Sequence, residues 1–220
     1  MLLSICMPTK GRGPQALRCI EQLFKTTVGF DVECVVVAHP DESNLGVFLT
    51  PIPNVTIIWQ ECSAIQGWNI AASQAKGDYL KVGDDDLWYH DGWLEETMKV
   101  VQATPEGHGY FKIRSDSSNY WAERAIGSRK FFVETLGGVL CIPKYLSQYD
   151  DVEKTDRAMA AGLFFEAPKA YIEHRHWVYG KAEKDETYMR GGIALVNKDQ
   201  VTYQQRKAAG FPTDYNGVFK

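Results

Sequence analysis

Short apolar runs alternate with helical segments over the first 86 residues, and this alternation constrains the fold more than any other feature. A helix is predicted over 15–24, where apolar residues recur at helical spacing, and a second helix over 67–75. The runs of strand length cover residues 2–7, 33–38, 55–59 and 78–83. Strands that alternate with helices form a largely parallel sheet, and its ligands bind beyond the carboxyl ends of the strands. The pattern therefore predicts an α/β fold with its site at that edge.

The second half of the chain has a less regular pattern. Helices are predicted over 93–102 and 151–161, and a strand over 109–114. Residues 115–129 are polar with interspersed aromatic side chains, which indicates loops or a small hairpin. Further extended segments are predicted over 131–142, with a turn at Gly137-Gly138, and over 163–166 and 170–174. The last 45 residues have weaker periodicity, and we expect them to form a lid or docking segment.

Composition places the chain among globular proteins. Its 220 residues carry a formal net charge of −4, with 45% hydrophobic and 24% charged residues, which excludes disordered, collagen-like and coiled-coil classes. This length predicts one domain with a C-terminal appendage. Apolar runs fall well short of the ~20 residues that span a bilayer. The first seven residues lack signal-peptide features, so a cytoplasmic location is expected. Five cysteines without a CxxC pair predict reduced core thiols.

Three consecutive acids, Asp84-Asp85-Asp86, follow the predicted strand 78–83 directly. In an extended backbone alternate side chains share a face, so Asp84 and Asp86 are expected at one site while Asp85 turns away. Clustered carboxylates repel one another unless a cation lies between them. Mg²⁺ or Mn²⁺ takes carboxylate oxygens and keeps positions for substrate phosphates. The alternative is a solvated acidic turn, but the position after an apolar strand favours a metal site.

Two further clusters contain residue types that suit catalysis. His174 and His176 share a face if they lie on a strand, and either can complete an Asp/Asp/His metal site; the alternative is a packed or surface histidine. Asp150-Asp151 opens a predicted helix, where acids are favoured by capping and by the helix dipole. Alternatively, a carboxylate here acts as a general base that accepts a proton from an acceptor hydroxyl.

Five motifs in this order are similar to those of a known family. They are Pro8-Thr9-Lys10-Gly11-Arg12, the segment 68–79, Asp84-Asp85-Asp86 followed by His90-Asp91-Gly92-Trp93-Leu94, Asp150-Asp151 with Arg157 and Gly162, and the segment 168–174. Over roughly residues 2–176 the chain resembles the nucleotide-sugar-dependent glycosyltransferases with a GT-A fold, in particular family 2. One departure follows the second strand, where the family carries Asp-Asp-Gly-Ser. This chain has Ala38-His39-Pro40-Asp41-Glu42-Ser43 there, with Asp41 as the candidate substitute.

The resemblance implies a GT-A (Rossmann-like) mixed, mainly parallel sheet flanked by helices. Residues 1–176 would form the glycosyltransferase domain, and 177–220 a C-terminal lid or acceptor-side extension of the same domain. The donor would be a nucleoside-diphosphate sugar, with a UDP-sugar expected, bound through Mn²⁺ or Mg²⁺. The metal ligands would be drawn from Asp84, Asp86, His174 and His176. The nucleotide-sugar site would contain Pro8, Thr9, Arg12, Asp41, Asn69, Asp84 and Asp85. The catalytic base would be Asp151.

The sequence leaves several alternatives open. A non-catalytic binding module on the same scaffold and a nucleotidyltransferase are the rival functions. The acceptor is a small molecule, a glycan or a modified nucleic-acid base; the last rests on a local basic patch of Arg124, Arg129 and Lys130. Residues 180–188 form either a lid or an ordinary charged loop. Six aromatic residues form either a stacking platform or core: Tyr110, Phe111, Tyr120, Trp121, Phe131 and Phe132.

Overall fold

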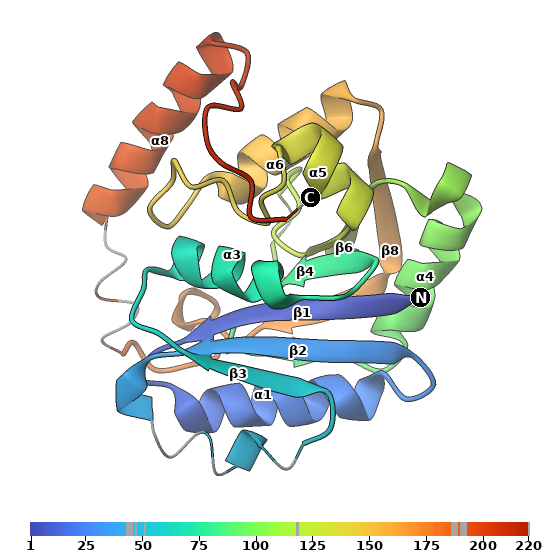
Figure 1. The fold of residues 1–220 in the computed structure, drawn as a ribbon, viewed down its shortest axis with the longest axis vertical. Helices are drawn as coiled ribbons and strands as arrows, with labels where there is room; N and C mark the ends of the chain where they lie inside the picture. The colour runs from blue at the N-terminus through green and yellow to red at the C-terminus, as the bar shows by residue number, and fades with distance from the viewer. Residues whose placement is uncertain are drawn as a thin grey trace.

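A single curled sheet of eight strands organises the molecule (Figure 1). The computed structural model describes residues 1–42, 46, 48–50, 52–117, 119–185, 189 and 193–219. The strands follow one another across the sheet in the order β3-β2-β1-β4-β7-β6-β8-β5. Because β7 and β5 alone run against their neighbours in this order, the sheet is mixed and mainly parallel, as predicted.

The strands predicted in the first half of the chain are confirmed, and one of them has the predicted bounds. The bounds are β1 Leu2–Thr9, β2 Asp31–Ala38, β3 Val55–Trp59 and β4 Tyr79–Val82. The second half contributes β5 Leu87–Tyr89, β6 Tyr110–Arg114, β7 Ala125–Ser128 and β8 Phe164–His174. β6 and β7 pair as a hairpin, to which residues 115–129, predicted as loops or a small hairpin, contribute β7 alone. The two extended pieces predicted around 163–174 are one strand, β8, which has a register irregularity opposite Ile113 and Arg114.

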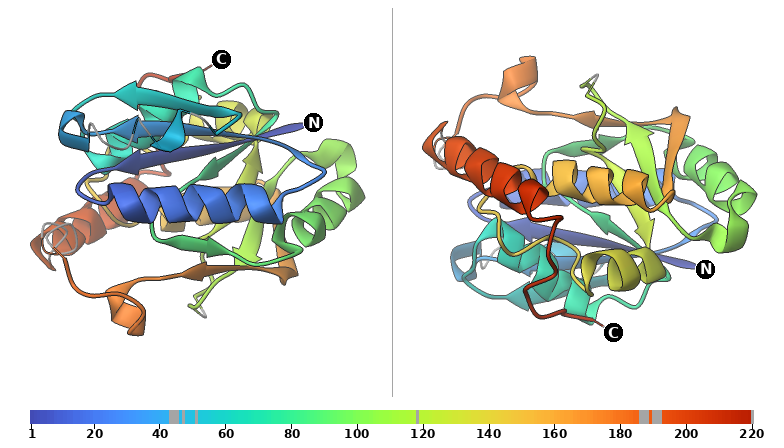
Figure 2. Two further views of the ribbon diagram at one scale, coloured as in Figure 1. Left: turned by 90° about the horizontal axis from the view of Figure 1, so that it is seen from below. Right: turned by 90° about the horizontal axis from the view of Figure 1, so that it is seen from above.

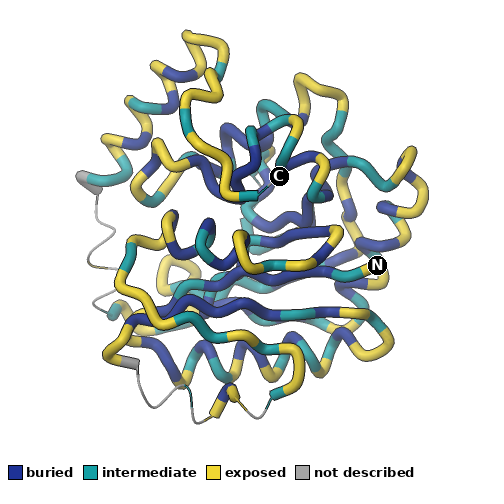
Figure 3. Tube along the Cα trace, viewed as in Figure 1, coloured by how far each residue is buried: buried dark blue, intermediate teal, exposed yellow. Residues whose placement is uncertain are grey.

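Helices cover both faces of the sheet (Figure 2). One face is covered by α1 Gly13–Thr26 and α4 Trp93–Ala103, which share a core with alternate residues of β1 such as Ile5 and Met7. The other face is covered by α3 Ala64–Gln74, α5 Arg129–Leu136 and α6 Asp150–Ala160, with α8 Ile193–Ala208 outside them. Short 3₁₀ turns lie at Pro40–Glu42, Pro105–Gly107 and Trp177–Tyr179. Burial is continuous along β1 and β2, which are covered on both sides (Figure 3).

The prediction of a strand over 131–142 is wrong. This segment begins with helix α5, whose N-cap residue Ser128 accepts a hydrogen bond from the Phe131 N–H. The helix ends at Gly137, which has a φ of 67°. A left-handed residue of this kind is the usual helix C-cap, so the Gly137-Gly138 pair ends a helix rather than turning a strand. A short apolar run cannot be assigned by its periodicity alone, and here the two caps decide.

The C-terminal residues pack on α5 and α6. The final segment approaches Gly138, whose carbonyl accepts the Val218 N–H at 2.6 Å. No helix in the described ranges is long and apolar enough to cross a membrane. All five cysteines are free thiols and four of them are buried, as predicted.

Candidate functional site

A large cleft of about 1130 Å³ opens at the carboxyl ends of β1, β2 and β4. One half contains Pro8, Thr9, Arg12 and the acidic triplet, which the sequence predicts for the nucleotide-sugar and metal site, together with His39. Its other half is formed by the β6–β7 hairpin, by the loop before α6 and by the residues that follow β8. The cleft therefore joins segments that are far apart in sequence, at the edge where a mainly parallel sheet binds ligands.

Each carboxylate of the triplet has a basic neighbour, and Arg12 Nη1 lies near two of them, 3.2 Å from Asp85 Oδ1 and 3.8 Å from Asp86 Oδ2. Residues 85–86 form a turn between β4 and β5, so the alternation expected of an extended backbone does not apply, and all three acids line the cleft. Asp84 Oδ2 lies 3.3 Å from Arg124 Nη1. Asp86 Oδ1 lies 3.1 Å from His174 Nε2. The prediction that Asp85 turns away is therefore wrong, because the turn brings it into the same site.

Asp85 is held by the loop that follows β1. Its carboxylate accepts a hydrogen bond from Thr9 Oγ1 at 2.9 Å and one from Arg12 Nη1 at 3.2 Å. Burial and, to a smaller extent, the neighbouring Asp86 raise the pKa of Asp85 to about 7 against the opposing effect of Arg12 and Thr9. The Arg12 guanidinium also donates to both carboxylate oxygens of Asp185, at 2.7 and 2.9 Å. Arg12 therefore joins the acidic turn to the C-terminal segment.

The predicted lid is in contact with this site in its described part. Besides the Arg12–Asp185 pair, Lys181 Nζ lies 2.6 Å from Asp116 Oδ1 and 3.1 Å from Glu173 Oε1. Residues 186–188 of the predicted lid lie outside the described residues. Whether the segment opens and closes stays a prediction, but the described part is anchored by ion pairs.

His174, the last residue of β8, and His176, two residues beyond it, have different environments. The backbone N–H of His174 donates to Asp116 Oδ2 at 2.6 Å, and its ring faces Asp86. His176 Nδ1 accepts the Val178 N–H at 3.2 Å and caps the following 3₁₀ turn. Burial and the adjacent His174 lower the pKa of His176. Both rings line the cleft, with centroids 4.9 Å apart, and Asp86 acts on both: its Oδ1 lies 3.1 Å from His174 Nε2, and its charge opposes the lowering of the His176 pKa.

The donor set fits a divalent cation only in part. Within the described ranges, no group of three or more His, Cys, Asp or Glu side chains is arranged to hold a metal ion. Asp86 Oδ1 and His174 Nε2 are, however, 3.1 Å apart, and two adjacent ligands of an octahedral Mg²⁺ ion are also about 3 Å apart. Such ions are often held by one or two protein ligands and completed by substrate phosphates and water. The pair fits a metal that the substrate helps to bind.

The two acids that begin α6 have separate roles. Asp150 accepts the Ile142 N–H at 2.7 Å and pairs with the buried Lys154 at 2.5 Å, so it is a structural residue. Asp151 lines the cleft and accepts the Val152 N–H at 2.9 Å. Burial, with a further contribution from the adjacent Asp150, raises the pKa of Asp151 to about 6. A carboxylate with a pKa near neutrality is well suited to act as a general base.

Two predicted nucleotide-sugar residues lie outside the cleft lining. Asp41 is exposed, and its carboxylate lies 3.1 Å from His39 Nδ1. Asn69 is buried and does not face the cleft: its Oδ1 accepts the N–H groups of Leu140 and Cys141, and its Nδ2 donates to the Cys141 carbonyl. The prediction for Asn69 is corrected to a structural role, because these contacts fix α3 against the segment after α5.

Sequence reasoning missed the place of two basic side chains in the cleft, His39 and Arg124. His39 stands at the end of β2, where the family carries an acid, so the departure in that motif was the available signal. Its Nε2 is buried without a hydrogen-bond partner among the described residues, and lies 3.5 Å from Glu61 Oε1. Arg124 is buried beside Asp84, and its Nε also has no hydrogen-bond partner among those residues. Arg124 was predicted only as part of a basic patch, because nothing in the sequence shows that it lies beside Asp84.

The six aromatic residues divide between core and cleft. Tyr110, Phe111, Phe131 and Phe132 are buried in the core, whereas Tyr120 is 49% exposed. Tyr120 and Trp121 line the cleft, as do Trp177 and Tyr179 from the turn after β8. The core alternative is therefore confirmed for four residues of the predicted set, and a stacking platform of Tyr120 and Trp121 stays a prediction.

The predicted basic patch is not a free surface. Arg124 is buried beside Asp84, and Arg129 donates to the carbonyls of Ala75 and Gly77 at 2.8 and 2.9 Å. Lys130 pairs with Glu106 at 3.0 Å. These three side chains therefore provide no patch for a nucleic-acid backbone.

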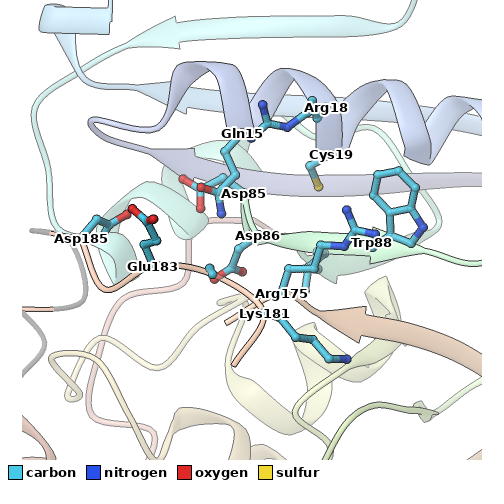
Figure 4. Close-up of a pocket in the computed structure, with 12 residues that line it drawn as sticks. Gln15, Arg18, Cys19, Asp85, Asp86, Trp88, Arg175, Lys181, Glu183 and Asp185 are labelled. Atoms are coloured by element: carbon cyan, nitrogen blue, oxygen red, sulfur yellow. The ribbon is translucent and has the colours of Figure 1, made fainter. Parts of the chain in front are cut away.

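A smaller cavity of about 370 Å³ lies against the same acidic turn (Figure 4). Asp85 and Asp86 line both cavities. On this side they face a helix α1 residue, Gln15, and Arg175, whose guanidinium carbon lies 3.7 Å from the Trp88 ring centroid. The acidic turn therefore separates the large cleft from this smaller cavity.

The sheet order and the cleft at its edge define the class as a GT-A glycosyltransferase, and solved structures share this fold. The mannosyltransferase PcManGT from Pyrobaculum calidifontis, solved with GDP-Man and Mn²⁺, aligns with a TM-score of 0.68 at 17% identity, over 94% of this chain and 64% of that chain. TarS from S. aureus, in complex with UDP-GlcNAc, aligns with a TM-score of 0.63 at 14% identity, over 88% of this chain and 62% of that chain. The chain thus spans less than two thirds of either structure.

The chain belongs to glycosyltransferase family 2. The family model, described as glycosyl transferase family 2, matches residues 4–156. Glycosyltransferase GlyG of Streptococcus pneumoniae serotype 4 is 23% identical over 232 aligned positions, which cover 98% of this chain and 74% of the relative. The protein is therefore a glycosyltransferase, and membership of this family favours glycosyl transfer over the nucleotidyltransferase and the non-catalytic module.

Proposed function

We propose that the protein transfers a sugar from a nucleoside-diphosphate sugar to an acceptor hydroxyl with the help of Mn²⁺ or Mg²⁺. The observation that carries this proposal is the single cleft that contains Arg12, the Asp86–His174 pair and Asp151. These groups supply, in order, a cation for phosphate, two ligands for a metal and a carboxylate for a proton.

The donor is proposed to bind between the ends of β1, β2 and β4. Pro8, Thr9, Arg12 and Asp85 line this half, and a UDP-sugar is the first candidate. Arg124 supports a diphosphate here, because its guanidinium lies beside Asp84 and retains a buried Nε–H without a hydrogen-bond partner among the described residues. The related structures contain GDP-Man in one case and UDP-GlcNAc in the other, which supports the diphosphate rather than one base.

The metal is proposed to be held by Asp86 and His174, with Asp84 and His176 beside them. A bound divalent cation would offset the negative charge that develops on the departing diphosphate. Asp116 orients His174 by accepting its backbone N–H, and Thr9 and Arg12 hold the acidic turn in place. The chain thus positions both ligands before the substrate arrives.

Asp151 is proposed as the general base. It would accept the proton of the acceptor hydroxyl while the oxygen forms its bond to the anomeric carbon and the diphosphate leaves. The transition state then resembles an oxocarbenium ion, as in glycoside hydrolysis. The acceptor would lie between Asp151 and the aromatic wall of Trp121 and Tyr179, on the side to which α8 contributes Val196 and Tyr203. This arrangement supports 177–220 as the acceptor-side extension.

The decisive experiment measures the melting temperature with nucleoside diphosphates in the presence and absence of Mn²⁺. We expect UDP or GDP to raise the melting temperature of the wild type, and the increase to require the metal. Asp86→Ala and His174→Ala should abolish the metal-dependent part, whereas Asp91→Ala, an exposed acid in the next turn, should leave it unchanged. If no nucleoside diphosphate stabilises the wild type with Mn²⁺ present, the proposal fails.

A further inference from the structure

Helix α8 lies outside the segment that the family model matches, yet it packs beside α6 (Figures 1 and 2). Within 195–208, where the structure describes burial, three residues are buried: Asp199, Tyr203 and Arg206. Their spacing of i, i+4 and i+7 places them on one face of the helix. This buried face is polar, so α8 is held by directional contacts as well as by apolar packing.

Asp199 binds the loop that precedes α6. Asp199 is 1% exposed, and its carboxylate accepts three backbone N–H groups. The donors are Leu146 at 2.9 Å, Ser147 at 2.8 Å and Gln148 at 2.8 Å. Hydrogen bonds to a carboxylate are stronger than those between neutral groups, and three of them on consecutive residues fix the backbone of this loop.

The other two buried residues of α8 bind α6 itself. Arg206 donates to both carboxylate oxygens of the fully buried Glu153, at 2.8 and 2.9 Å. Tyr203 Oη donates to Asp156 Oδ2 at 2.6 Å, and its ring packs in a tilted arrangement against Tyr149 with the centroids 5.5 Å apart. The helix therefore contacts the segment before Asp151 and the turn after it.

The backbone between these contacts is strained. Tyr149, the N-cap residue of α6, has a φ of 66°, which is unfavourable for any residue with a side chain of this size. Such a conformation persists only where the surrounding structure imposes it. Asp199 holds the three preceding residues and Tyr203 packs on the Tyr149 ring. Asp151 follows two residues later, so its position depends on this conformation.

We propose that Asp199 is a positioning residue for the catalytic base: α8 holds the loop 146–149 in the strained conformation that points Asp151 into the cleft. This inference rests on the proposed function of Asp151 as the base. Loop residues Ser147 and Gln148 themselves line the cleft, so Asp199 also shapes the acceptor side. The donor half of the cleft is formed by other elements and does not depend on α8.

The test compares Asp199→Ala and Asp199→Asn in the full chain, with Gln200→Ala as the matched control, an exposed neighbour on α8. Hydrolysis of UDP-glucose, UDP-N-acetylglucosamine and GDP-mannose with Mn²⁺ serves as the activity assay, with water as the acceptor. Amide hydrogen exchange of residues 146–152 is measured in parallel. We expect Asp199→Ala to lower kcat about ten- to a hundredfold with the KM for the donor unchanged, because a small displacement of a catalytic group has effects of this size.

Exchange in Asp199→Ala should increase at 146–152 and stay unchanged in β1, β2 and β4. Asp199→Asn retains an oxygen acceptor and should recover part of kcat and of the protection. Unchanged exchange at 146–152, or a loss confined to the melting temperature with kcat preserved, would overturn the proposal. If the wild type binds no nucleoside diphosphate with Mn²⁺ and hydrolyses none of the three donors, the proposed function fails and the assignment of Asp199 to a catalytic base fails with it. In that case, faster exchange at 146–152 in Asp199→Ala would show that Asp199 holds the loop for structural reasons alone, and unchanged exchange would show that it does not hold the loop.

Discussion

Replacing Asp151 with asparagine should make the enzyme inactive and, at alkaline pH, more stable. Asparagine has the same shape, and its Oδ1 can still accept the Val152 N–H that Asp151 accepts. It cannot take a proton from an acceptor. Because burial raises the pKa of Asp151 from 3.8 to about 6, the folded protein binds this proton more tightly than the unfolded chain does. Stability from this group is present below pH 3.8 and is lost as the pH rises through about 6.

The magnitude follows from that pKa. A difference between 3.8 and about 6 corresponds to at most about 3 kcal/mol, and partial contact with water in the cleft reduces it to about 1–3 kcal/mol. For a chain of this size each kcal/mol changes the melting temperature by about 2–4 °C. Asp151→Asn should therefore raise the melting temperature by roughly 2–12 °C at pH 8 and have little effect at pH 4.

The pH dependence of wild-type donor hydrolysis provides the second measurement. With a pKa of about 6, about a tenth of Asp151 is ionised at pH 5 and about nine tenths at pH 7. We expect kcat at saturating donor to be roughly tenfold lower at pH 5 than at pH 7. Glu123→Gln should move this acidic limb to lower pH, because the Glu123 charge raises the pKa of Asp151. The Lys154 charge lowers the pKa of Asp151, and this residue is not substituted in the experiment.

The matched control is Asp150→Asn, one residue earlier. It removes the charge partner of the buried Lys154, so it should lower the melting temperature at pH 8, whereas Asp151→Asn raises it. The reasoning is refuted if Asp151→Asn keeps wild-type hydrolysis, or if it destabilises the protein at pH 8 as Asp150→Asn does.

Three further substitutions test the packing around the site. Arg206→Met leaves the buried Glu153 without its bidentate partner and should lower the free energy of unfolding, measured in urea, by about 3–5 kcal/mol. The exposed control Gln205→Ala should lower it by less than about 0.5 kcal/mol. A loss below about 1 kcal/mol in Arg206→Met contradicts this prediction. Gly83→Ala places a Cβ 2.7 Å from Ile5 Cγ2 and 3.1 Å from the Cys6 carbonyl oxygen, and should cost about 1–3 kcal/mol in thermal unfolding; unchanged stability would show that β1 can shift. Trp68→Phe removes the indole N–H that donates to the Gly83 carbonyl at 2.7 Å, and should lower the free energy of unfolding by about 1 kcal/mol and weaken metal-dependent nucleotide binding. Calorimetry with UDP and Mn²⁺ measures this binding. An unchanged affinity argues against a role for this contact in placing the acidic turn.

Local patterns predicted most of the sheet and part of the site. The apolar runs of β1, β2 and β3 have strand length, and the periodicity of α1 gives its buried face. Since parallel strands bring their carboxyl ends together, the loop after β1 and the acidic triplet were expected at one place, and they are in contact there. The order of the motifs further predicted the family, which the match over residues 4–156 confirms.

Tertiary contacts decided the features that local patterns left open. The segment that begins α5 is short and apolar, and its state depended on the Ser128 cap and the left-handed Gly137. Helix α8 escaped prediction because its buried stripe consists of Asp199, Tyr203 and Arg206, which an analysis of apolar periodicity does not register.

The acidic triplet shows the same division. Its place at the end of β4, its charge and its need for cationic neighbours were properties of the sequence alone. Which acid meets Arg12, which meets Arg124 and which meets His174 depended on a turn in the backbone and on partners that come from distant segments. The sequence therefore determined the chemistry available at this edge of the sheet, because short-range patterns encode strands and their ends. The tertiary structure decided the role of each carboxylate, because burial and charge partners are long-range properties.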